Sequence, residues 1–235
     1  VWENMLGFEH NEKKLAVITA GGTLTPRIID SFRTGALLRW KIELISRIIP
    51  ENREIVRRMV EINVFGLAAV TTALLPSMRE RRSGTILNVS SVGGVRSFSA
   101  VGWYNATKFA VEGLSDALAQ EVGPLGIRVV VIEPSAFATD WAGSSAAEVA
   151  PERVIADYDA TAGEYRRNFR ANVGKEAGDP LRAATAIVDV AHDANPPKRL
   201  PLGNYAYDGL LEKLDEIRAD VAPREAVSRS ADRPG

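Results

Sequence analysis

The stretches TILNVSS at residues 85–91 and IRVVVI at residues 127–132 decide the fold class of this chain. Each begins as a short apolar run rich in β-branched residues and is bounded by turn signals, which is typical of a strand covered on both faces. Between them, residues 104–122 carry apolar side chains at helical spacing and end at Gly123-Pro124. Buried strands that alternate with helices predict an α/β fold with a parallel sheet and a ligand site at the carboxyl ends of its strands.

The same alternation continues on both sides of this central stretch. Residues 14–19 (KLAVIT) predict a buried strand before the turn at Ala20-Gly21-Gly22, and residues 51–82 predict a long amphipathic helix. Residues 23–52 have no clean period, so no element is assigned to them. Further elements are expected downstream: helices over 151–172, 179–193 and 205–221, a small edge strand over 199–202, and a frayed tail over 223–235.

The composition is that of an ordinary globular protein. The 235 residues, 46% apolar and 25% charged, predict a single domain over residues 1–235, with an atypical segment at 1–52. A net charge of −1 gives no basic field for nucleic acid, and the absence of cysteine removes thiol chemistry. His10 and His192 lack metal-ligand spacing, so no metal site is expected. Without a recognisable signal sequence or a run of about 20 apolar residues, we expect a cytoplasmic protein without a membrane partner.

Tyr104 and Lys108 are the candidate proton-transfer pair. They stand four residues apart at the start of a predicted helix, so their side chains share one face. An adjacent ammonium and a helix N-terminus both favour a phenolate, which predicts a lowered pKa for Tyr104. A phenol with such a pKa can give or take a proton, although this spacing also arises by chance.

The surrounding residues make the pair more specific. Ser91 directly follows a predicted strand, 13 residues before Tyr104, and Asn63 lies 28 residues before Ser91 in the preceding helix. This register, together with Tyr-Asn-Ala-Thr-Lys at 104–108 and Pro-Ser-Ala-Phe-Ala-Thr at 134–139, resembles the short-chain dehydrogenase/reductase family over roughly residues 51–205. The resemblance implies a Rossmann-like, doubly wound parallel sheet.

The resemblance also implies roles for the four residues in register. Tyr104 would be the general acid/base, and Ser91 would hydrogen-bond the substrate oxygen. Lys108 would hold the nicotinamide ribose and lower the pKa of the phenol. Asn63 would anchor a water that links Lys108 to solvent.

A nicotinamide cofactor, NAD or NADP, is implied in the same way. Thr139 would hydrogen-bond its carboxamide and Phe137 would make a neighbouring contact, while Ser135 replaces the usual glycine of the family. Gly21 and Gly22 are the candidate residues of the glycine-rich turn. The substrate would be a small alcohol or carbonyl compound.

The glycine-rich turn departs from the family pattern. Thr19-Ala20-Gly21-Gly22-Thr23-Leu24-Thr25-Pro26 lacks the later glycines, and no second strand ends in a residue that would recognise the adenosine ribose. Two alignments remain open. Residues 15–22 are either the first strand followed by a deletion, or the fourth strand with Thr19-Ala20-Gly21 in place of Asn-Ala-Gly. Under either alignment the sheet is incomplete at its N-terminal half.

Three functions compete. The first is an NAD(P)-dependent oxidoreductase that interconverts a secondary alcohol and a carbonyl, and the second is a cofactor-deficient remnant or non-catalytic subunit of the same fold. The third is a nucleotide-sugar epimerase or dehydratase, which uses the same Tyr-Lys pair but is disfavoured by the short C-terminal region. By resemblance, a homodimer or homotetramer is expected through the helices at 51–82 and 104–122. Aromatic residues beyond position 140 line either a substrate pocket or the core: Trp141, Tyr158, Tyr165 and Phe169.

Overall fold

The computed structural model describes residues 9–10, 13–19, 22–23, 53–139 and 155–233. In these residues a six-stranded sheet has the order β1-β2-β4-β5-β6, and β3 pairs with β2. The parallel pairs β2–β4, β4–β5 and β5–β6 confirm the predicted α/β fold. The strands are β1 Glu9–His10, β2 Lys13–Thr19, β3 Gly22–Thr23, β4 Gly84–Val89, β5 Ile127–Pro134 and β6 Arg199–Leu202.

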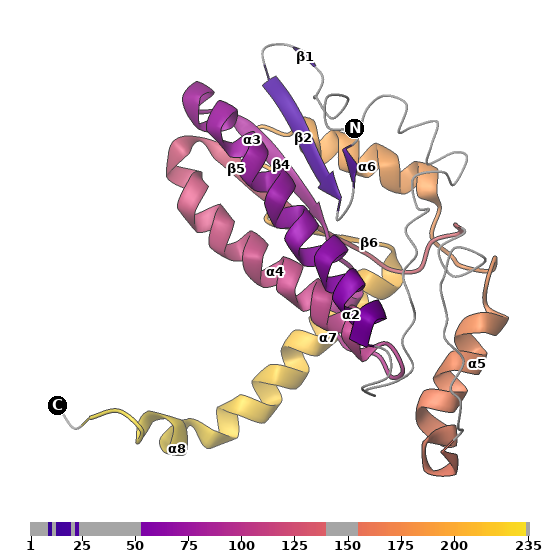
Figure 1. Cartoon of the computed structure of the whole chain (residues 1–235). Helices are drawn as coiled ribbons and strands as arrows, with labels where there is room; N and C mark the ends of the chain where they lie inside the picture. The colour runs from indigo at the N-terminus through magenta and orange to yellow at the C-terminus, as the bar shows by residue number, and fades with distance from the viewer. Residues whose placement is uncertain (1–8, 11–12, 20–21, 24–52, 140–154, 234–235) are drawn as a thin grey trace.

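Helices lie on both faces of this sheet (Figure 1), with α3 and α4 on one face and α6 on the other. The first long helix is continuous through α2 Arg53–Val60, the π-helical η3 Glu61–Gly66 and α3 Leu67–Arg81. The others are α4 Gly102–Val122, α5 Glu164–Ala171, α6 Pro180–His192, α7 Asn204–Val221 and α8 Glu225–Arg229. The short turns are η4 Val92–Gly94, η5 Gly123–Leu125, η6 Ala156–Tyr158, η7 Asp159–Gly163 and η8 Ala222–Arg224.

The core is divided between the two faces of β4 and β5. Ile86 packs with Leu67 and Val111 on the face covered by α3 and α4. The neighbouring Leu87 packs with Ile187 of α6 on the opposite face. Successive side chains of a strand point to opposite faces, so this alternation shows why both strands are apolar along their length.

The N-terminal strand lies directly beside β4. Leu15 pairs with Thr85 and Ile18 with Asn88 in parallel register. In a doubly wound sheet the fourth strand lies beside the fifth. The position of β2 beside β4 therefore favours the alignment that makes residues 15–22 the fourth strand of the family. The two-residue strands β1 and β3 were not predicted, and both run antiparallel to β2. The chain has therefore reversed direction by Gly22.

The helix Glu54–Arg81 is more apolar than the sequence interpretation allowed. By length and composition alone it is long and apolar enough to cross a membrane, and 22% of its most apolar window is buried. The expectation that no apolar run approaches the length of a span was therefore wrong, because Glu61 is the only charged residue between Val60 and Pro76. Leu67 and Met78 of this helix pack in the core over the sheet.

The C-terminal stretch is helical where a frayed tail was expected. After α7, the chain continues through η8 and α8, in which every residue is exposed. Arg229 donates to Glu225 over 2.7 Å, a helical pair at i,i+4 that stabilises the short helix. These elements extend away from the sheet and its covering helices (Figure 1).

Candidate active site

Two hydroxyl groups meet at the carboxyl end of β4. Ser91 follows this strand and caps η4, because its Oγ accepts a hydrogen bond from the Gly93 N–H at 3.0 Å. Tyr104 lies in the first turn of α4, and its hydroxyl is hydrogen-bonded to Ser91. Both side chains are buried, with 8% of each residue exposed. The end of β4 therefore holds a serine and a tyrosine side by side, as their sequence register predicted.

Lys108 lies one helical turn beyond Tyr104 on the same face of α4. Its Nζ is 5.8 Å from the centroid of the Tyr104 ring and donates to the Val89 carbonyl oxygen at 3.0 Å. Burial lowers the pKa of Lys108 to about 8, because an ammonium removed from water loses its hydration. The amine therefore titrates within two units of neutral pH.

The pKa of Tyr104 moves in the opposite direction to the one expected from its neighbours. Burial raises the pKa of this phenol to about 12, and the Ser91 hydrogen bond offsets the rise only in part. The ammonium of Lys108 was expected to dominate, but it is directed to the Val89 carbonyl. In this structure Tyr104 is therefore a neutral proton donor and not a phenolate.

Asn63 reaches the same site from the first long helix. Its Nδ2 donates to Thr107 Oγ1 at 3.0 Å, and that hydroxyl donates to the Tyr104 carbonyl oxygen at 2.8 Å. Asn63 lies in η3, a π-helical segment that the apolar spacing did not predict. Such segments occur often at functional sites because they turn a side chain out of the regular helical register. The structure thus brings all four predicted catalytic residues into one buried group.

The predicted cofactor residues after β5 lie at the same edge of the sheet. Ser91 Oγ donates to the Pro134 carbonyl oxygen at 3.5 Å, which joins the ends of β4 and β5. Phe137 forms a parallel bridge with Gly178, and Thr139 donates to the Phe137 carbonyl oxygen at 3.4 Å. Both side chains are half-buried.

The predicted glycine turn is placed differently. Gly22 belongs to β3, and Gly21 lies outside the described residues. A strand that leads into a helix would present backbone N–H groups to a pyrophosphate. Here the chain pairs back onto β2 instead, with Thr19 opposite Gly22.

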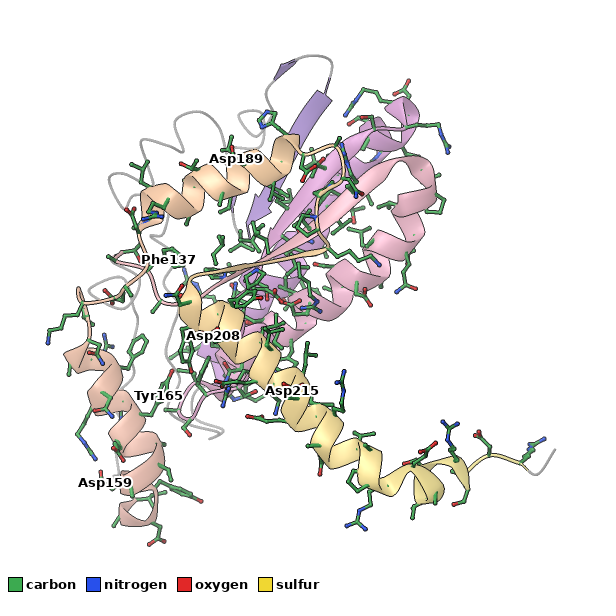
Figure 2. The ribbon with its side chains drawn as sticks, turned by 180° about the vertical axis from the view of Figure 1, so that it is seen from behind. Phe137, Asp159, Tyr165, Asp189, Asp208 and Asp215 are labelled. Atoms are coloured by element: carbon green, nitrogen blue, oxygen red, sulfur yellow. The ribbon has the colours of Figure 1, made fainter. Side chains whose placement is uncertain are left out.

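Aromatic residues of the expected lid pack against the site. Tyr165 stacks with Phe98 at 6.1 Å and with Phe169 at 6.3 Å between ring centroids. This group packs against the buried cluster that contains Tyr104, and Tyr165 contributes to the raised pKa of that phenol. Figure 2 shows Tyr165 on α5, with Asp159 farther along the same segment. Tyr158 is exposed, and Trp141 lies outside the described residues. Of the four aromatic residues, Tyr165 and Phe169 are therefore the two that the structure places against the site.

A second group of charged residues was missed by the sequence interpretation. Glu112 and Glu133 are buried, and Arg199 bridges their carboxylates from β6. One signal was available: Tyr104, Lys108 and Glu112 follow at successive intervals of four, so all three share one face of the helix. Arg199 carried no comparable signal, because its partners are distant in sequence.

The nicotinamide end of a cofactor fits the residues present. Lys108 has three N–H donors, and the described residues give it one hydrogen bond, to Val89. Its remaining donors suit the hydroxyl groups of a ribose, and Thr139, after the end of β5, has a half-buried hydroxyl that also donates to the Phe137 carbonyl oxygen. Within the N-terminal residues that the structure describes, no strand-to-helix turn is present for a pyrophosphate.

Comparison with known proteins agrees with this geometry. The family model described as short chain dehydrogenase matches residues 46–150. The uncharacterized oxidoreductase SPAC977.08 of Schizosaccharomyces pombe is 32% identical over 69% of this chain and 68% of its own length. The chain belongs to the short-chain dehydrogenase/reductase family.

Two further relatives of this oxidoreductase family define the extent of the match. A short-chain dehydrogenase structure from Streptomyces avermitilis is 39% identical with a TM-score of 0.69, over 83% of this chain and 68% of that one. Oxidoreductase BOA17 of Botryotinia fuckeliana is 39% identical over 63% of this chain and 53% of its own length. The chain therefore spans about half the length of that curated relative.

Proposed function

We propose that this chain is an NAD(P)-dependent oxidoreductase that interconverts a secondary alcohol and a carbonyl compound. The observation that carries the proposal is the hydrogen-bonded pair of buried hydroxyls, Ser91 and Tyr104, with Lys108 one turn behind. Two hydroxyls that converge on one point suit an oxygen atom on which negative charge develops.

The residues divide the proton chemistry between them. In the reducing direction, the Ser91 hydroxyl hydrogen-bonds the substrate oxygen, and the neutral Tyr104 phenol donates the proton. Burial favours the protonated phenol, because it raises the pKa of Tyr104 to about 12. A charged Lys108 stabilises the phenolate left after transfer, and Asn63 with Thr107 holds the first turn of α4 in place.

The cofactor, NAD or NADP, supplies the hydride. Lys108 binds its nicotinamide ribose through the donors that Val89 leaves free, and Thr139 and Phe137 bind the nicotinamide itself. Tyr165 and Phe169 close the other side of the site and exclude water from the substrate. An apolar alcohol or carbonyl compound is the substrate class that matches these aromatic rings.

A second copy of the chain is the partner that fits the exposed apolar helices. Phe65 of η3 and Phe109 and Leu114 of α4 are exposed, with 56%, 44% and 42% of each residue accessible. Burying such side chains against another copy removes apolar surface from water. We therefore assign the apolar surface of Glu54–Arg81 to a homodimer or homotetramer and not to a membrane.

The alternative function is a non-catalytic subunit that no longer binds a dinucleotide. It is favoured by one observation, the antiparallel pairing of Thr19 with Gly22, because the described N-terminal residues then offer no strand-to-helix turn for a pyrophosphate. The proton-transfer residues would then remain as a structural group.

Fluorescence titration with NADH and NADPH separates the two functions. Binding of either reduced cofactor is expected, with energy transfer from tryptophan as the signal. No binding of either at millimolar concentration would contradict the oxidoreductase proposal and favour the subunit. A Lys108→Met variant is the matched control, since it removes the ribose donor and is expected to weaken binding.

A further inference from the structure

A buried pair of carboxyl groups lies behind the catalytic helix. Glu112 comes from α4, and Glu133 comes from the end of β5. Arg199 at the start of β6 donates through one nitrogen, Nη1, to both: to Glu112 Oε2 at 2.8 Å and to Glu133 Oε1 at 2.5 Å. The two Glu side chains are 8% and 1% exposed, so neither carboxyl group relies on water for its partner.

The charges of this group do not balance if both carboxyl groups are ionised, because one guanidinium faces two carboxylates. Among the described residues, Glu112 Oε1 and Glu133 Oε2 are buried without a hydrogen-bond partner. A buried carboxylate oxygen without a donor is costly, and two adjacent carboxyl groups relieve the cost by retaining one proton between them. Burial raises the pKa of both groups, and the mutual repulsion raises that of Glu133 further, to about 7.

The pair is also linked to the proposed site through Glu112, which lies on the same helix as Lys108. Glu112 follows Lys108 by one helical turn, and the attraction between them raises the pKa of Lys108 against the effect of burial. The Ser90 hydroxyl, next to Ser91 in the chain, donates to the Lys108 carbonyl oxygen at 3.4 Å. Its polar contact with Glu112 lowers the pKa of that carboxyl against the larger effect of burial. Gly94 of η4 packs on this contact, since a Cβ there would lie 2.9 Å from Glu112 Oε1.

No other charged group among the described residues shares this space. From α4 the pair faces Lys108, and from β6 it faces Arg199. The end of β4 and η4 contribute uncharged groups. On the adjacent α7, Glu212 and Glu216 are engaged elsewhere, because Arg96 forms ion pairs with them at 2.7 Å and 3.2 Å.

We infer that Glu112 and Glu133 share one proton while Arg199 binds both carboxyl groups. We further infer that Glu112 is a positioning residue that keeps Lys108 charged. Ionised Glu112 attracts the ammonium, whereas Glu133 competes with Glu112 for ionisation only below the pH at which Lys108 titrates. The catalytic meaning of Lys108 rests on the proposed function, but the electrostatic link between the three residues does not.

The test is a titration of Lys108 itself, followed by NMR on the full chain with isotope-labelled lysine and without cofactor. Loss of one signal in Lys108→Arg assigns it. In the parent chain the midpoint is expected at about 8. Glu112→Gln is expected to lower it by about half a pH unit or more, because the attracting carboxylate is gone.

Glu133→Gln should leave the Lys108 midpoint unchanged, because Glu133, with a pKa of about 7, is already largely ionised at the midpoint and Glu112 is the carboxylate that attracts the ammonium. Asp116→Asn, which removes an exposed charge one turn beyond Glu112, is expected to leave the midpoint within about 0.2 units. An unchanged midpoint in Glu112→Gln, or a fall in Glu133→Gln, would overturn the inference. If Glu112→Gln does not fold, the Glu133→Gln result decides alone.

This titration is independent of the proposed function. It needs neither cofactor nor turnover, so a chain that fails to bind NADH or NADPH still gives a midpoint for Lys108. If the chain binds neither NADH nor NADPH but the Lys108 midpoints are as expected, the proposed function fails and the electrostatic link between Glu112 and Lys108 stands.

Discussion

Residues 53–139 and the strands within residues 9–23 differ in what each could contribute to the proposed dinucleotide site. The first region builds the proton-transfer group from two helices and two strand ends that are adjacent along the chain and bury one another. The second contributes one parallel strand, β2, and then reverses at β3. Proton transfer needs side chains on a rigid core, whereas pyrophosphate binding needs backbone N–H groups at a strand-to-helix turn. The two kinds of binding therefore make different demands on the chain.

The largest effect is expected from Tyr104→Phe, which removes the proton donor and retains the buried ring. Turnover should fall by about 10²–10⁴-fold, because a general acid contributes that much. Cofactor affinity and thermal stability should stay close to those of the parent chain. Tyr207→Phe, on the exposed surface of α7, is the matched control for loss of a hydroxyl. Full activity in Tyr104→Phe would refute the role of this tyrosine.

The core of the first region is tested by Ile132→Ala in β5. Ile132 is fully buried and packs in a cluster with Leu87 of β4 and Ile187 of α6, so its truncation should lower the free energy of unfolding by about 2–5 kcal/mol. Val188→Ala, on the exposed side of α6, should cost much less. Urea unfolding of both variants measures the difference. Equal losses would show that the sheet is not the core on which the site is built.

The pH dependence of activity is expected to follow Lys108 and not Tyr104. The pKa of Lys108 is lowered to about 8, so its ammonium is present below that pH and is lost above it. The pKa of Tyr104 is raised to about 12, so the phenol remains a proton donor throughout. Carbonyl reduction, measured as kcat/KM, should be level below pH 8 and decline by up to about tenfold per pH unit above it. An increase above pH 8 would contradict this assignment.

The smallest expected effect is on cofactor affinity, measured in one variant from each of the two regions. Thr139→Val should weaken cofactor binding by about fivefold, because one hydrogen bond contributes about 1 kcal/mol. Gly22→Ala, in β3, should change affinity less, because the chain has already reversed there. Isothermal titration of both variants gives the ratio. A larger loss at Gly22 would show that the N-terminal region holds the cofactor after all.

Most of the fold was predictable because its signals are local. The apolar runs of β2, β4, β5 and β6 and the helical spacing of residues 104–122 and 205–221 each predict an element from a few adjacent residues. The two-residue strands β1 and β3 carry no such pattern and exist only by pairing with β2. The exposed helix α8 lacks an apolar face, so periodicity gave no signal for it.

The site was predictable in its membership but not in its electrostatics. The register of Ser91, Tyr104, Lys108 and Asn63 was found through its resemblance to the family, and the structure brings these residues together. The direction of the Tyr104 pKa was wrong because spacing does not measure burial, and burial dominates that group. Arg199 was missed because its bonds to Glu112 and Glu133 join residues that are 87 and 66 positions away.

The central claim is that this chain holds the nicotinamide end of a cofactor through residues 91–139. Saturation-transfer NMR on NADP bound to the full chain tests it most directly, because the signal of each ligand proton reports its closeness to the protein. The nicotinamide protons are expected to receive more saturation than the adenine protons, and Thr139→Val should reduce that difference. Stronger saturation of the adenine, or no saturation of either ring, would contradict the claim.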